Sequence, residues 1–136
     1  MSYKTVKDGI IGILNSLGYD ESAEAVDFKN AAALTYQSTF ILKCLSGEIA
    51  EQIQNYFYDD QEWQVQIAFE RNSQNDLVSR DRMQAAKDAV LVALDDPDSW
   101  ESFVHFMKYV KWSMVEAPNY YVLDIRLQVK DRYTYS

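Results

Sequence analysis

Residues 121–135 read YVLDIRLQVKDRYTY, and this stretch has the clearest pattern in the chain. Apolar residues occupy every second position from Tyr121 to Val129, and from Asp124 onward the positions between them are charged or polar. A two-residue period predicts a β-strand with one face on a core and the other in water. We place this strand at 119–133, where it would span about 45 Å at about 3.3 Å per residue. Strands usually have roughly 3 to 10 residues, so this one is unusually long.

A small domain does not cover a strand of this length, so we expect its far end to reach a neighbouring subunit. Tyr133 and Tyr135 continue the apolar positions beyond Asp131, as they would in an interface strand. The simpler alternative is a long final strand with a frayed tail. The contact residues predicted in this strand are Tyr121, Arg126, Arg132, Tyr133 and Tyr135.

The rest of the chain supplies the other layers of an α+β fold. Helical spacing of apolar residues predicts helices at 3–17 and 80–95, and Gly18 is suited to end the first. Further strands are predicted at 36–45, 63–71 and 103–113. The expected order is α-β-β-α-β-β, in a single domain spanning residues 1–136. Two helices packed on one face of an antiparallel four-stranded sheet is the natural architecture for this order.

Residues 46–61 fit neither pattern cleanly. Ile49, Ile53 and Phe57 have helical spacing, yet the segment lies between two predicted strands. We favour a long hairpin excursion, which is usually functional or flexible at this length. A local helix folded back on the sheet is the alternative. The contact residues predicted in this excursion are Ile49, Ile53, Tyr56, Phe57 and Tyr58.

Composition narrows the classes of function. Among 136 residues, 14% are aromatic, which favours strands and interfaces. The net charge of −8 argues against binding nucleic acid by phosphate neutralisation. Two basic pairs, Arg80/Arg82 and Lys108/Lys111, are too sparse to reverse that balance. No apolar run approaches 18 residues, so no membrane span is expected.

Catalytic signals are weak. The single histidine, His105, lies in a predicted strand, and the single cysteine, Cys44, is expected in the core. One cysteine excludes an internal disulfide and suits a reducing cytoplasm. Two acidic clusters, 59–62 and 95–98, lack the spacing of a known cation loop. We therefore expect no enzyme activity, no cofactor and no metal site.

Several stretches together resemble a known family. The order and pattern of these stretches are similar to those of the tail terminator proteins of long-tailed bacteriophages, and of related tail-completion or neck proteins. The likeness covers nearly the whole chain and includes the "DP.SW" motif after the second helix. The family has no fixed catalytic or binding signature, so no functional role is assigned to individual residues from the resemblance. The stretches are VDFKNAAALTYQSTFILKCLSGE (26–48), DQEWQVQIAFERN (60–72), DRMQAAKDAVLVALDDPDSW (81–100), VHFMKYVKW (104–112) and YYVLDIRLQVKDRYTY (120–135).

The resemblance implies a structural role in the virion. Such proteins form a hexameric ring that caps the tail tube, stops its polymerisation and joins the tail to the head connector or neck. Partners would be other copies of the chain, the tube protein and the connector, with DNA passing the lumen without specific binding. The protein would be found in the tail or neck, and in the host cytoplasm during assembly.

Two other readings stay open. A head-completion or neck connector protein would have the same composition. A small acidic adaptor protein of the host cytoplasm would bind one partner and stay monomeric.

Overall fold

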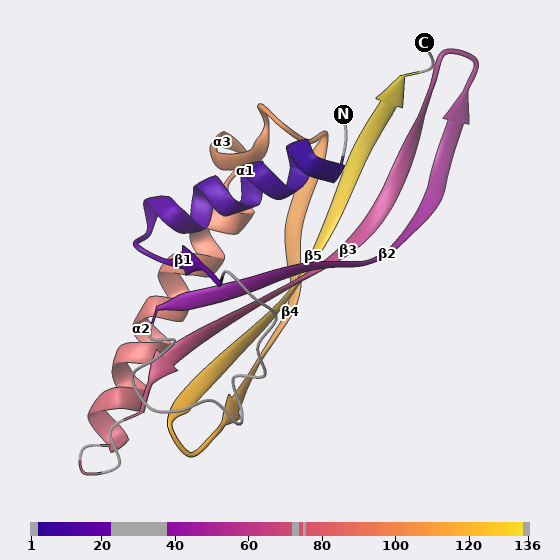
Figure 1. Cartoon of the computed structure of the whole chain (residues 1–136). Coiled ribbons are helices and arrows are strands. Elements are labelled where there is room, and N and C mark those ends of the chain that lie inside the picture. The colour runs from indigo at the N-terminus through magenta and orange to yellow at the C-terminus, as the bar shows by residue number, and fades with distance from the viewer. Residues whose placement is uncertain (1–2, 23–37, 72–73, 75, 135–136) are drawn as a thin grey trace.

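The computed structural model describes residues 3–22, 38–71, 74 and 76–134. In this part of the chain, five strands form one mixed sheet, and three helices accompany it, which makes the fold α+β (Figure 1). The elements are α1 (Tyr3–Ser16), β1 (Asp20–Glu21), β2 (Thr39–Ile53), β3 (Tyr56–Glu70), α2 (Asp76–Asp95), α3 (Pro97–Trp100), β4 (Phe106–Glu116) and β5 (Tyr120–Thr134).

The strand order is β1-β2-β3-β5-β4. β1 runs parallel to β2, and the other neighbours are antiparallel. The prediction of four antiparallel strands is therefore wrong in detail. The additional strand has only two residues, Asp20 and Glu21, which is too short to produce an alternation in the sequence.

The helix count also differs from the prediction of two helices. No helix was predicted after residue 95, but Pro97–Trp100 form α3, with Asp96 as its N-cap. The Asp96 side chain accepts a hydrogen bond from the Asp98 backbone N–H at 3.1 Å, and Pro97 occupies the first turn. A four-residue helix is too short to leave a helical period.

The excursion predicted at 46–61 is a β-hairpin. β2 and β3 run through it and stay paired down to Ile53 and Tyr56, with the turn at residues 54 and 55. The strands predicted at 36–45 and 63–71 are therefore parts of two much longer strands. Positions 36 and 37 lie outside the described residues.

Other boundaries lie close to those expected. The helix predicted at 3–17 ends at Ser16, and the helix predicted at 80–95 begins one turn earlier, at Asp76. The strands predicted at 103–113 and 119–133 occupy 106–116 and 120–134.

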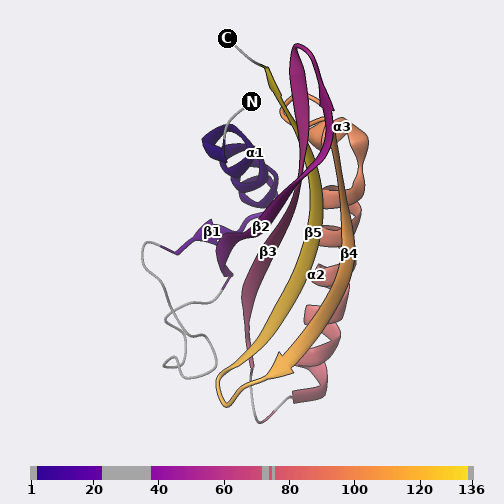
Figure 2. The same cartoon turned by 90° about the vertical axis from the view of Figure 1, so that its right-hand side faces the viewer.

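The core lies between the helices and one face of the sheet (Figures 1 and 2). α1 contributes Val6, Ile10 and Leu14, and α2 contributes Val90 and Leu94, all 0% exposed. We call the opposite side of the sheet the polar face; at one end it carries a second apolar cluster, formed by Ala68, Tyr120 and Val122. The sheet residues in the core are Phe40, Leu42, Trp63, Val65, Ile67, Met107, Leu123, Ile125, Leu127 and Val129.

Candidate interaction surface

The sheet extends beyond the helices. We call this part the sheet arm: residues 46–62 of the β2–β3 hairpin and residues 128–134 of β5. It projects past α1 and α3, toward the end of the chain marked C (Figures 1 and 2). Both segments that were predicted to make contacts lie side by side here, because β3 pairs with β5 from Tyr56 and Thr134 onward.

This pairing changes the prediction for the last strand. Its far end was expected to reach a neighbouring subunit, but the β2–β3 hairpin of the same chain pairs with it. β5 also has β4 on its other side along Tyr121–Lys130, so this part of β5 is interior to the sheet. Residues 131–134 pair with β3 alone among the described residues. Alternation along a strand reveals which side chains share a face, but not which strands lie beside it.

Aromatic side chains cross-link the sheet arm. Phe57 stacks on Tyr133 with ring centroids 5.1 Å apart and an interplanar angle of 11°. Tyr56 and Tyr58 meet edge to face at 5.5 Å, and the Arg132 guanidinium lies 5.5 Å from the Tyr56 ring centroid. Tyr56 and Tyr58 both lie on β3, whereas the Phe57–Tyr133 and Arg132–Tyr56 pairs join β3 to β5. Aromatic and cation–π pairs across strands stabilise a sheet that lacks helix cover.

A polar network lies at the base of the sheet arm. The Trp63 indole N–H donates to Gln61 Oε1 at 2.8 Å, and Gln61 Nε2 donates to Asp59 at 2.9 Å and to the Tyr133 hydroxyl at 3.2 Å. Asp131 lies opposite Asp59 in the strand pairing and is 0% exposed. Its Oδ2 has no hydrogen-bond partner among the described residues. Burial raises the pKa of Asp131, and the nearby charge of Asp59 raises it further.

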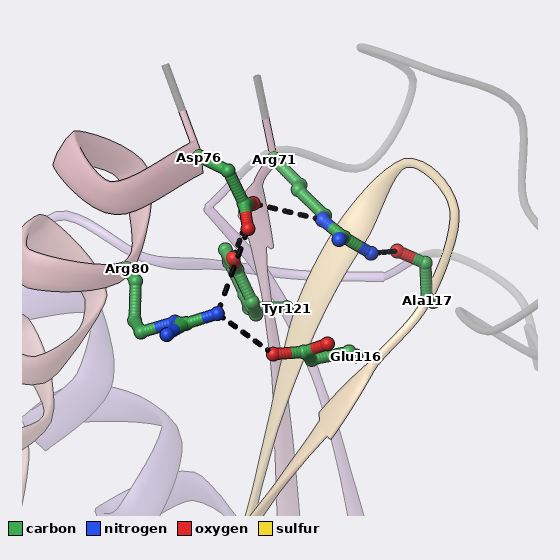
Figure 3. Close-up of polar contacts among 6 residues, drawn as sticks. All are labelled: Arg71, Asp76, Arg80, Glu116, Ala117 and Tyr121. Atoms are coloured by element: carbon green, nitrogen blue, oxygen red, sulfur yellow. Dashed lines mark hydrogen bonds and ion pairs between the residues drawn. The ribbon is translucent and has the colours of Figure 1, made fainter. Parts of the chain in front are cut away.

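Tyr121 was predicted as a contact residue, but it is 0% exposed. Its hydroxyl donates a hydrogen bond to the Asp76 carboxylate (Figure 3). Arg71 Nε donates to the same carboxylate at 2.9 Å, and Arg80 lies 3.6 Å from it and 3.2 Å from Glu116. The Tyr121 side chain is thus occupied inside the molecule and is not available to a partner.

The cluster around Tyr121 fastens the start of α2 to the β4–β5 hairpin. Arg71 also donates to the Ala117 carbonyl at 2.9 Å, in the turn between these strands (Figure 3). The hydrogen bond from Tyr121, followed by the one from Arg71, lowers the pKa of Asp76. Burial and the bond to Asp76 raise the pKa of Tyr121. These shifts favour an ionised Asp76 carboxylate beside a neutral Tyr121 phenol. The pair therefore holds α2 against the β4–β5 hairpin.

The remaining predicted contact residues have mixed positions. Ile49 is 60% exposed on β2. Ile53 is placed only as a strand position, opposite Tyr56. Tyr135 lies outside the described residues.

Arg126 lies in a groove of about 620 Å³ on the polar face, between β2, β3, β4 and β5. Its guanidinium donates to Asp124 and to Glu62, each at 3.2 Å, and the bond to Asp124 raises the pKa of Arg126. Asp124 also accepts from Gln64 Nε2 at 2.6 Å and from Gln66 Nε2 at 3.3 Å. These five side chains therefore satisfy one another, whereas Oδ1 of Asp60, which also lines the groove, is buried without a hydrogen-bond partner among the described residues.

The two candidates for nucleophile and base do not come together. Cys44 was expected in the core, but the residue is exposed. Partial burial of its thiol raises the pKa of that group. His105 is exposed, with its ring 4.8 Å from that of Tyr58.

The acidic cluster at 59–62 is divided between the two faces of the sheet, because successive strand residues point to opposite sides. Across the described ranges, no three His, Cys, Asp or Glu side chains are grouped so that they could hold a metal ion. In the same part of the chain, no helix has the length and apolar content needed to span a membrane.

Two strand edges are open, and the sequence did not reveal either of them. Among the described residues, the outer side of β2 is paired by β1 only at Thr39 and Phe40, and β4 has no strand on its outer side. These edges lie at opposite sides of the sheet and belong to different strands. Their unpaired backbone groups are available to a further strand.

The sequence matches none of the protein-family models and none of the curated proteins with which it was compared.

Proposed function

We propose that the chain is a bacteriophage tail terminator, a structural virion protein that assembles into a ring and caps the tail tube. The observation that carries this proposal is the sheet with two different open edges and an arm that extends beyond the helices. A closed ring requires a head-to-tail contact between two different surfaces of the subunit. The edges of β2 and β4 provide such a pair of surfaces.

The sheet arm is the part suited to a second partner. The stacked Phe57–Tyr133 pair joins β3 to β5 in this arm, which stabilises it where no helix covers it. In the proposed mechanism, one surface of the ring mimics the next ring of the tube and docks on the tube end. The other surface differs from a tube ring and accepts the connector instead, so tube growth stops.

Charge supports a lumen through which DNA passes. The chain carries a net charge of −8, and the segment 45–62 contains no lysine or arginine. A lumen with excess negative charge repels phosphate and prevents DNA from sticking. The acidic residues that this segment contributes on β3 are Asp59, Asp60 and Glu62.

The closest alternative is a head-completion or neck connector protein, which would use the same open edges but bind DNA-filled heads. A small cytoplasmic adaptor protein is less well supported, because one partner would occupy only one surface and leave the other edge and the sheet arm unused. The proposal has no catalytic step, and it places the protein in the virion tail or neck after assembly in the host cytoplasm.

Arrest of tube growth tests the proposal. The tube protein of the same phage should polymerise into long tubes alone, and into shorter, capped tubes when this protein is added. Electron microscopy measures the tube lengths and shows a ring at one tube end. Unchanged tube lengths together with binding to filled heads would favour the connector alternative, and unchanged lengths without head binding would favour the adaptor.

A further inference from the structure

We propose that neighbouring copies pair β4 of one subunit with β2 of the next, antiparallel, with Lys108 opposite Glu51 and Lys111 opposite Glu48. This inference rests on the proposed ring and specifies its subunit contact. It makes the two sheets continuous across the interface.

The direction of the strands allows this pairing without inverting a subunit. β2 is antiparallel to β3, β3 to β5 and β5 to β4, so the two edge strands run in opposite directions. When the next subunit is placed beside the first in the same orientation, β4 and the neighbouring β2 are therefore antiparallel.

Matching irregularities give the two edges the same charge spacing. In β4, Lys108 lies opposite Gln128 and Lys111 opposite Arg126, with a bulge at Val110 between them. Gln128 and Arg126 are two residues apart on β5, so both lysine positions belong to the polar face although three residues separate them.

β2 repeats this arrangement with acidic residues. Glu48 lies opposite Asp60 and Glu51 opposite Tyr58, with a bulge between Ile49 and Glu51. Asp60 and Tyr58 are again two residues apart, so both glutamate positions belong to the polar face. Glu51 is placed by this strand pairing, and its charge is given by the sequence.

One antiparallel register satisfies both charge pairs. A three-residue step forward from Lys108 to Lys111 corresponds to a three-residue step back from Glu51 to Glu48. The same register brings Val110 opposite Ile49, and each of these apolar side chains is 60% exposed. Cross-strand pairs of opposite charge and of apolar residues both stabilise a sheet.

Exposed apolar surface is concentrated on these edges. Of the ten large apolar residues that are exposed in the described ranges, six lie on β2 and β4. Apolar residues in solvent on open edges indicate a surface that another chain covers. The six are Leu45, Ile49, Phe106, Tyr109, Val110 and Trp112.

Charge also excludes the symmetric arrangements. Pairing β4 with β4 would bring lysines near lysines, and pairing β2 with β2 would bring glutamates near glutamates. Like charges that face each other across strands are destabilising. The ion pairs within the described part of the chain do not use Lys108, Lys111 or Glu48. A β4–β2 contact neutralises both edges and propagates head to tail.

Charge exchange tests this pairing. We expect Lys108→Glu/Lys111→Glu to weaken self-association at least tenfold, and Glu48→Lys/Glu51→Lys to do the same. The variant with all four substitutions, in which the charges have been exchanged, should have a self-association constant within about threefold of that of the unmodified chain. Light scattering measures the association, and circular dichroism verifies that each variant is folded. Lys4→Glu/Arg82→Glu is the matched control, since it makes the same charge change on exposed helix positions and should not alter association.

Each outcome decides the pairing separately from the function. If the original chain assembles and the double variants assemble equally well, the β4–β2 contact is overturned while the ring stands. If the double variants dissociate and the exchange fails to restore assembly, the proposed register is overturned. If the original chain stays monomeric at every concentration, the pairing is overturned, and the tube-growth experiment decides the function independently.

Discussion

Gly9 shows how a single residue allows close packing. A Cβ at this position would lie closer than 3.0 Å to three carbon atoms of the Phe103 ring, which is buried against α1. Gly12, one turn later in the same helix, is exposed, and a Cβ there would meet nothing within 4 Å. The two glycines were visible in the sequence, but only the fold shows which of them is needed.

We therefore expect Gly9→Ala and Gly12→Ala to have opposite effects. Gly9→Ala overpacks the contact with Phe103 and should lower the free energy of unfolding by about 1 to 3 kcal/mol. Gly12→Ala, the matched control, should raise it by up to about 1 kcal/mol, because alanine is the better helix former. Chemical denaturation followed by circular dichroism measures both. Equal effects of the two substitutions would show that Phe103 does not pack on Gly9.

Among the elements, sequence pattern predicted those that bury one face. The helix at 3–17, the apolar face of the last strand and the strand at 63–71 all produce a period because Val6, Trp63 and Ile125 face the core. The β2–β3 part of the sheet arm contributes no residue to the core, so its residues do not follow such a period. β1 and α3 are too short to show one.

The candidate surface was predicted in part. The segment 46–61 and the far end of the last strand were predicted to make contacts, and the structure brings Tyr56, Tyr58 and Tyr133 of these segments into the sheet arm. Tyr121 and Cys44 were misplaced, because residue type does not reveal whether a side chain meets a polar partner inside the fold or lies at an open edge. The edges of β2 and β4 follow from strand order, which depends on long-range pairing.

The fastening of α2 to the β4–β5 hairpin should depend on pH. The folded protein lowers the pKa of Asp76, so ionised Asp76 stabilises the fold above the ordinary aspartate pKa of about 3.9. This contribution is lost as the pH falls through the lowered value. Asp76→Asn should therefore lower the thermal unfolding midpoint at neutral pH, and the gap to the original chain should narrow in acid.

Thermal unfolding across pH 2 to 7, a range chosen around the aspartate pKa of about 3.9, measures this gap. Asp81→Asn is the control, because Asp81 is exposed on the same helix. A gap for Asp76→Asn that stays constant with pH would mean that the charge of Asp76 does not stabilise the fold.

At the level of the whole molecule, the proposed assembly uses the acidic edge of β2, the basic edge of β4 and the sheet arm. An open edge invites uncontrolled pairing, and proteins usually blunt such edges with charges and bulges. Here both edges carry both devices, at matching positions. In the proposed ring, the same features that discourage pairing with foreign strands would select a second copy of this chain.

The mass of the purified protein in solution, measured by light scattering at several concentrations, tests the ring most directly. We expect a single discrete species near six subunits. Added salt should weaken the association between subunits, because it screens the charge pairs at the edges. A monomer at every concentration would contradict a self-assembling ring. A mass that rises continuously with concentration would show that the head-to-tail contact forms but does not close.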